Sequence, residues 1–169
     1  ALQQVADEEG SDDEQEEEEE RLRRNCEEAV GSVVEVNRAE FLPLLPECSQ
    51  RISAWLGSKK HKVLGLYLSC DLVANLQEQS MPVWPCFMPE VFNTLVAGKD
   101  PDERTAAAYA INLAAPLASF AEAAPEAFRR LVQALSPKRP PKRDAKGRMA
   151  YDNAVAALFT LGLEQSACC

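Results

Sequence analysis

Acidic side chains cluster near the start of the chain and form its strongest candidate for a binding site. Residues 7–20 hold eleven acidic residues and no base, although the whole 169-residue chain, with 27 acids and 18 Lys and Arg, has a net charge of only -9. Such a segment attracts basic protein surfaces over long range and repels phosphates. We therefore predict no direct binding of nucleic acid, and contact with a basic partner through Asp12, Asp13, Glu14, Glu16, Glu17, Glu18, Glu19 and Glu20. The alternative is a solvated insert between helices.

A second charged feature, of opposite sign, lies at residues 137–148. This proline-rich loop contains one acid, Asp144, and six bases: Lys138, Arg139, Lys142, Arg143, Lys146 and Arg148. The pattern is typical of a nuclear localisation signal or a nucleic-acid patch. It lacks the interleaved aromatic residues on which single-stranded bases stack. The alternative is a connector that its prolines keep extended and that pairs with the acidic segment of the same chain.

The residues that catalysis or metal binding would need are sparse. The only histidine, His61, lies among lysines, where we expect a surface side chain. The six cysteines form no CxxC motif, which disfavours a zinc site and predicts reduced, buried thiols in a cytosolic or nuclear protein. Nucleotide-binding and hydrolase motifs are missing from the sequence. We therefore predict neither an enzyme nor a cofactor, and no apolar run is long enough to span a membrane.

Hydrophobic periodicity predicts helices throughout and no strand. The expected helices are 13–36, 41–56, 60–76, 86–96, 101–120, 124–135 and 148–163. Proline and acids at Pro101–Glu103 mark one clear helix start, and Pro116 should kink or end that helix. Residues 60–76 are apolar almost all round, which predicts burial between neighbours. We expect four side chains of 124–135 to point inward, namely Phe128, Leu131, Val132 and Leu135.

The aromatic residues receive two different predictions. Trp84, which stands beside prolines, is the best candidate for an exposed hydrophobic contact. The others are expected in the core or along the wall of a groove: Trp55, Phe87, Phe92 and Tyr109.

Similar helix centres recur along the chain and predict a repeat architecture. The centres Cys70–Val73, Ile111–Ala114 and Ala157–Thr160 are 41 and 46 residues apart, the period of HEAT and armadillo repeats. We therefore predict an all-α fold, a right-handed α-solenoid of antiparallel HEAT-like helix pairs. Its expected parts are an acidic inter-helix segment (1–12), repeats at 13–58, 59–98 and 99–136, the basic loop 137–148, and the first helix of a further repeat at 149–169.

The third of these units resembles the HEAT signature in detail. An acid, Asp100, precedes the helix, Arg104 follows, and small residues fill Ala106–Ala110. In HEAT solenoids such acids and arginines pair between stacked repeats while alanines permit close packing. The resemblance therefore implies repeat-stacking roles for Asp100, Arg104 and Asp152.

The order of these features over residues 7–165 resembles the importin-beta family of nuclear transport receptors, and within it the importin-five-like subgroup. The matching stretches follow the acidic segment: Phe41–Pro46, Cys70–Val73, Arg104–Tyr109 and Asn153–Ala157. Family members are several times longer, so the resemblance implies a fragment of the C-terminal half. The loop Pro137–Arg148 is longer and more basic than in the family, so its role is not inherited.

The resemblance implies a receptor, monomeric in its full-length form, that shuttles between cytoplasm and nucleus. It would bind protein cargo with basic signals, Ran-GTP and Phe-Gly nucleoporins. Second helices of HEAT pairs line the concave face, which makes five residues candidate cargo contacts: Glu47, Gln50, Glu90, Asn93 and Glu126. The alternative is a HEAT scaffold without transport activity, such as a phosphatase or condensin-type assembly subunit.

Overall fold

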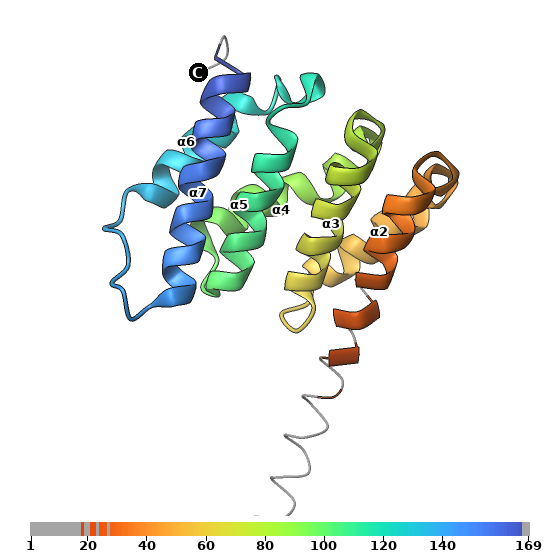
Figure 1. Ribbon diagram of the computed structural model, residues 1–169, viewed down its shortest axis with the longest axis horizontal. Helices are drawn as coiled ribbons and strands as arrows, with labels where there is room; N and C mark the ends of the chain where they lie inside the picture. Colours follow the sequence, from red (N-terminus) through yellow and green to blue (C-terminus); the bar gives the residue numbers. More distant parts are fainter. Residues whose placement is uncertain (1–17, 19–20, 23, 27, 167–169) are drawn as a thin grey trace, which may run out of the picture.

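The computed structural model describes residues 18, 21–22, 24–26 and 28–166, and in this part of the chain every regular element is a helix. The prediction of an all-α protein is therefore confirmed, and no strand occurs among the described residues. The helices are arranged in two layers that run across the molecule (Figure 1).

The first layer contains α3 (Lys62–Leu76), α5 (Pro101–Ala114) and α7 (Ala145–Glu164) side by side, with the helical residues 28–37 on the far side of α3. The second layer contains α2 (Leu45–Leu56), α4 (Trp84–Ala97) and α6 (Ala124–Leu135). Each second-layer helix packs against the first-layer helix that follows it in the chain. The central helix α5 thus contacts α3, α4 and α7 at once.

Short 3-10 helices precede the second-layer helices. They are η1 (Arg38–Leu44), η2 (Gln77–Val83) and η3 (Ala118–Phe120). Prolines explain several of these breaks, because proline lacks an N–H and fits best in the first turn of an α-helix; Pro89, inside α4, is an exception. Pro46, Pro85 and Pro125 all occupy first turns, of α2, α4 and α6.

Several helix bounds differ from those expected from the sequence. α2 begins at Leu45 rather than at 41, because Pro43 lies in η1 and Pro46 fits only a helix start. α5 ends at Ala114, just before Pro116, and residues up to 120 do not continue it. α3 and α4 begin within two residues of their expected starts, and α6 has the expected bounds.

The basic loop is shorter than expected because α7 begins earlier. The Asp144 carboxylate accepts a hydrogen bond of 2.9 Å from the Gly147 N–H, which caps the helix at Ala145 rather than near 148. Asp100 caps α5 in the same way, accepting from the Asp102 N–H at 2.9 Å. The connector before α7 is therefore 136–144.

The prediction that Trp84 is exposed is wrong. Its side chain is buried between the layers and lies edge-on to Phe120, with ring centroids 5.9 Å apart. Its indole N–H donates to the Ser80 hydroxyl at 2.9 Å, which satisfies the one polar atom that burial would otherwise leave unpaired. The flanking prolines thus start a helix that turns Trp84 inward.

The other aromatic residues divide between core and surface. Phe87 is fully buried, and Trp55 and Phe92 are partly buried against the core. Tyr109 was expected in the core or along a groove wall, but its side chain is exposed on α5. Phe128 and Val132 were expected to point inward but are exposed on α6, whereas Leu131 is buried and Leu135 partly buried.

Candidate interaction surfaces

Most of the acidic segment predicted to contact a basic partner lies outside the described residues: Asp12, Asp13, Glu14, Glu16, Glu17, Glu19 and Glu20. Glu18 is described, and it lies in a helix with an exposed side chain. Its carboxylate is 3.6 Å from the Arg21 guanidinium, one turn later. Such an exposed pair contributes little to stability and remains accessible to a partner.

The five candidate cargo contacts all lie on second-layer helices, but in two different settings. Glu47 and Gln50 are exposed on α2. On α4, Glu90 accepts hydrogen bonds from Thr94 at 3.2 Å and from Asn93 at 3.4 Å. Glu90 is therefore held by its own chain, whereas Glu47 and Gln50 present their polar groups to solvent.

A lysine that sequence reasoning did not single out joins three helices. The Lys62 ammonium, at the start of α3, is 2.6 Å from the Glu90 carboxylate on α4 and 3.7 Å from the Glu103 carboxylate on α5. All three side chains are largely shielded from solvent. The two carboxylates are thus already compensated, which reduces their capacity to attract an external cation. The only hint of these ion pairs in the sequence was the cluster of lysines at residues 59–62.

Glu126, on α6, is also engaged within the chain. It forms ion pairs with Arg129 and with Arg130, the latter at 2.7 Å. The hydrogen bond from Arg130, with the charges of both arginines, lowers the pKa of Glu126 below its ordinary value of 4.5. Glu126 therefore stays ionised and neutralised by its neighbours in neutral solution.

The residues predicted to pair between stacked repeats have local partners instead. Asp100 caps α5, and Arg104 donates to the carbonyl of Gly98 at 2.9 Å. Asp152 accepts from Arg139 of the preceding connector at 2.7 and 2.8 Å. Among the described contacts, none of the three bridges two first-layer helices.

Other residues join α5 to α7. The Lys146 ammonium is 2.6 Å from the Asp102 carboxylate, and the Thr160 hydroxyl donates to the Asn112 amide oxygen at 2.6 Å. The Gln165 amide donates to the carbonyls of Ala115 at 2.8 Å and Leu117 at 3.2 Å. Because these partners are 44 to 50 residues apart, sequence reasoning had no local signal for them.

A similar long-range contact joins the connectors at the opposite end of the helices. The Glu78 carboxylate accepts from the Ala118 N–H at 2.7 Å. Hydrogen bonding from Ser119 and from the Ala118 backbone lowers the pKa of Glu78. The carboxylate thus ties η2 to the start of η3.

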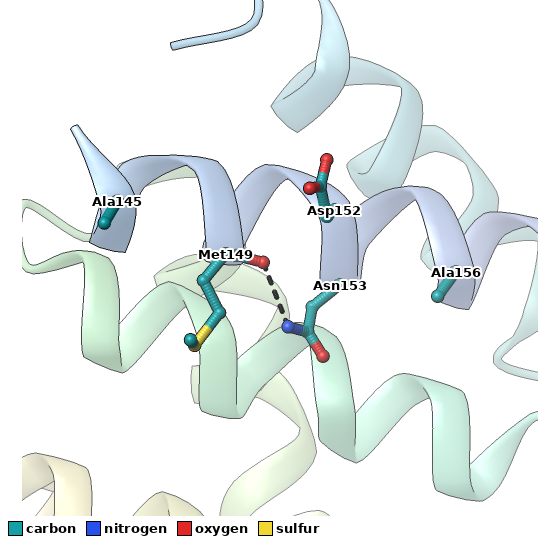
Figure 2. A pocket seen from close by; sticks show the side chains of 5 residues that line it. All are labelled: Ala145, Met149, Asp152, Asn153 and Ala156. Carbon is teal, nitrogen blue, oxygen red and sulfur yellow. Dashed lines mark hydrogen bonds between the residues drawn. The ribbon is translucent and has the colours of Figure 1, made fainter. Parts of the chain in front are cut away.

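The outer face of α7 carries a shallow hollow and exposed apolar side chains. A shallow hollow of about 450 Å³ is lined by Ala145, Met149, Asp152, Asn153 and Ala156 (Figure 2). The Asn153 amide donates to the Met149 carbonyl at 2.9 Å, so it stays close to its own helix. Further along this helix, Phe159 and Leu163 are 70% and 78% exposed. The face can accept an apolar partner.

The histidine and the described cysteines lie in different settings. His61 is half-buried, and its Nδ1 is 3.1 Å from the Ser58 hydroxyl. Cys70 is buried, as expected, and its thiol donates to the Ala106 carbonyl at 3.5 Å, whereas Cys26 and Cys86 are exposed; the four described cysteines form no disulfide. Burial is the main cause that raises the pKa of the half-buried Cys48 thiol. Within the described residues, no group of three or more His, Cys, Asp or Glu side chains could hold a metal ion.

Comparisons with known proteins do not add an identification. No family model, no curated protein and no solved structure matches this chain. None of the described helices combines the length and the apolar character needed to cross a bilayer.

Proposed function

We propose that this chain is a segment of a HEAT-type α-solenoid that belongs to a nuclear transport receptor. The main support for a solenoid is the regular spacing of the first-layer helices along the sequence. α3, α5 and α7 begin at Lys62, Pro101 and Ala145. These starts are 39 and 44 residues apart, close to the ~40 to 47 residues of HEAT and armadillo repeats. Each return passes through one helix of the second layer, as in stacked helix pairs.

Exposed apolar side chains at both ends of the layers support a position within a longer array. Leu22, Val33 and Val36 are exposed on the helix that precedes α2, and Phe159 and Leu163 are exposed on α7 at the other end. Internal repeats of a solenoid bury such faces against the next repeat, and only capping repeats have a polar outer face. In the proposed receptor, further helices cover both faces.

The transport role itself rests on the collinear resemblance to importin-beta receptors. In that role the protein shuttles between cytoplasm and nucleus and binds protein cargo with basic signals, Ran-GTP and Phe-Gly nucleoporins. The acidic segment 7–20 is the proposed contact for basic cargo signals, acting mainly on association rate and specificity. Glu47 and Gln50 remain the more accessible of the proposed cargo contacts, because Glu90 and Glu126 are paired within the chain.

The test is a pull-down of the full-length polypeptide with Ran carrying a non-hydrolysable GTP analogue, beside the same assay with Ran-GDP. We expect retention on the GTP form only, and retention on a Phe-Gly repeat peptide but not on its Ser-Gly counterpart. If the polypeptide binds neither Ran-GTP nor the Phe-Gly peptide, the transport role is overturned. That result would leave the second candidate, a HEAT scaffold of a multiprotein assembly, which is favoured because the second-layer carboxylates Glu90 and Glu126 are already neutralised within the chain.

A further inference from the structure

One serine of the chain lies directly before a proline and close to a base. Ser136 and Pro137 form the only serine–proline or threonine–proline pair in the sequence, and Arg139 follows three residues after the serine. Proline-directed protein kinases accept this order of residues. In their substrate groove an N–H directly after the serine would stay unpaired, which proline avoids, and a base at the third position meets negative charge. The sequence therefore meets the requirements of such a kinase at one place.

The hydroxyl of this serine is accessible in the fold. Ser136 is exposed and is the first residue after α6, which ends at Leu135. Its hydroxyl donates to the Val132 carbonyl at 2.8 Å, and its N–H donates to the Gln133 carbonyl at 3.3 Å. Water can replace both bonds at an exposed helix end, and such ends open at low cost in free energy. A kinase therefore has to open only the last turn of α6 to reach the oxygen.

The chain after Ser136 forms no structure that a kinase would have to break. Residues 137–141 belong to no regular element, and three of the five are prolines, which favour an extended backbone. The N–H groups of Lys138 and Arg139 donate no hydrogen bond to any described residue. The next backbone hydrogen bond is donated by Asp144, to the Pro141 carbonyl at 3.0 Å. This segment can therefore enter a substrate groove without losing hydrogen bonds of its own.

The base at the third position is held by a contact that can be exchanged. The Arg139 guanidinium donates to both carboxylate oxygens of Asp152, at 2.7 and 2.8 Å, and the two side chains are about half exposed. Exposed ion pairs of this kind contribute little to stability. Arg139 can therefore leave Asp152 for negative charge on a kinase, and afterwards for a phosphate on its own chain.

The surroundings of the serine offer positive charge to a phosphate. The connector 136–144 contains one acid, Asp144, and four bases, Lys138, Arg139, Lys142 and Arg143, so its net charge is +3. It leads into α7 at the end of the molecule where the other lysine-bearing connectors, 57–61 and 98–100, lead into α3 and α5 (Figure 1). A phosphoserine carries about -1.5 to -2 charges near neutral pH. The bases offset the unfavourable effect of an anion at the C-terminal end of α6.

We propose that Ser136 is a phosphorylation site for a proline-directed protein kinase. The Ser136 Oγ forms a bond to the γ-phosphorus of Mg²⁺-bound ATP while the bond from that phosphorus to the β–γ bridging oxygen breaks. ADP leaves, and the hydroxyl proton passes to the catalytic aspartate of the kinase. The phosphate lowers the charge of the connector from +3 to about +1 and competes with Asp152 for Arg139, which loosens the contact between the connector and α7. This inference holds whether or not the protein is a transport receptor.

The test is incubation of the full chain with a cyclin-dependent kinase, its cyclin and Mg²⁺-ATP, followed by mass spectrometry that locates the phosphate. We expect one phosphate, on Ser136. The variant P137A should lower the initial rate at least about tenfold, because alanine places an unpaired N–H in the groove of the kinase. The variant S53A is the matched control, since Ser53 is also exposed but is followed by alanine, and it should leave the rate unchanged.

Two further variants test the role of Arg139. R139Q should lower the rate about three- to tenfold, because it removes the base at the third position. D152N releases Arg139 and should raise the rate by up to about threefold, in keeping with the weakness of an exposed pair. A rate that R139Q leaves unchanged would overturn the part assigned to this base.

A synthetic peptide of residues 130–146 separates the effect of the fold from that of the sequence. Phosphate on the peptide but not on Ser136 of the folded chain would mean that the fold closes the connector, and the proposal would be wrong. It would be equally wrong if neither were modified, or if P137A reacted as fast as the unaltered chain.

Discussion

Helices α5 and α7 are neighbours in the same layer and differ in how many partners they have. α5 is covered by α3, α4 and α7, and its alanines at 106, 107, 108, 110 and 114 are fully buried. Among the described helices, α7 packs mainly against α5 and α6, and it buries Ala154, Ala157 and Leu161 while Phe159 and Leu163 remain exposed. The comparison shows that similar apolar content gives a core helix in one place and a half-exposed helix in another.

The difference between α5 and α7 lies in the side chains that pack against neighbouring helices. In α5, small side chains allow neighbours to approach on several sides, so an added methylene has no room. In α7, only one stripe has this constraint, and the opposite side tolerates large residues because nothing described packs there. The comparison yields three predictions, taken from the largest expected effect to the smallest.

The largest contrast should appear between two leucines of α7. Leu161 is fully buried and Leu163 is 78% exposed, although they are two residues apart. Leu161→Ala should lower the free energy of unfolding by about 2 to 5 kcal/mol, because it removes buried methyl groups and leaves a cavity. Leu163→Ala should change it by less than about 0.5 kcal/mol. Urea unfolding of both variants measures the difference, and equal losses would mean that the outer face of α7 is covered in solution.

Larger side chains should give a smaller difference in unfolding free energy between α5 and α7 than the two leucine variants do. Ala107→Leu in α5 should cost about 1 to 3 kcal/mol of unfolding free energy, because the buried site has no space for three more carbons. Ala156→Leu, in the hollow on the outer face of α7, is the matched control and should be neutral within about 0.5 kcal/mol. Thermal and urea unfolding check both. A neutral Ala107→Leu would contradict close packing around α5.

The smallest effect concerns the surface ion pair between the two helices. The hydrogen bond and charge of Asp102 raise the pKa of Lys146 above its ordinary value of 10.5. Because the folded-state pKa is raised, this contribution to stability is complete below pH 10.5 and is lost as pH rises through the raised pKa. Lys146→Met should therefore lower the melting temperature slightly near neutral pH and not at all at strongly alkaline pH. A difference that persists at high pH would mean that packing of the side chain, and not its charge, joins the helices.

Local signals were sufficient for much of the helical pattern. Pro101 beside Asp100 placed the start of α5, and Ala124–Pro125–Glu126 placed the start of α6, because caps and first-turn prolines act within a few residues. The start of α7 was missed although Asp144 provides a comparable cap, since the bases and prolines around it favoured a longer loop. The apolar character of residues 60–76 correctly indicated a buried helix.

The candidate surfaces were less predictable. Glu90 and Glu126 are polar residues on second-layer helices, as expected, but their pairing with Lys62 and with Arg129 and Arg130 alters what they offer to a partner. The partner of Glu90 is on another helix, 28 residues away in sequence, and no periodicity indicates such a contact. The outer face of α7 could not be distinguished from its inner face, because both contain large apolar residues.

The sequence by itself determined where helices form, where they break, and that opposite charges lie in the first twenty residues and in the connector before α7. These properties depend on residues within one or two turns of each other. Only the tertiary structure decided that Trp84 is enclosed against Phe120, that Phe159 is exposed, and that the lysine-bearing connectors share one end of the molecule. The reason is geometric: a helix's own pattern shows which residues share a face, while burial depends on which neighbour covers that face.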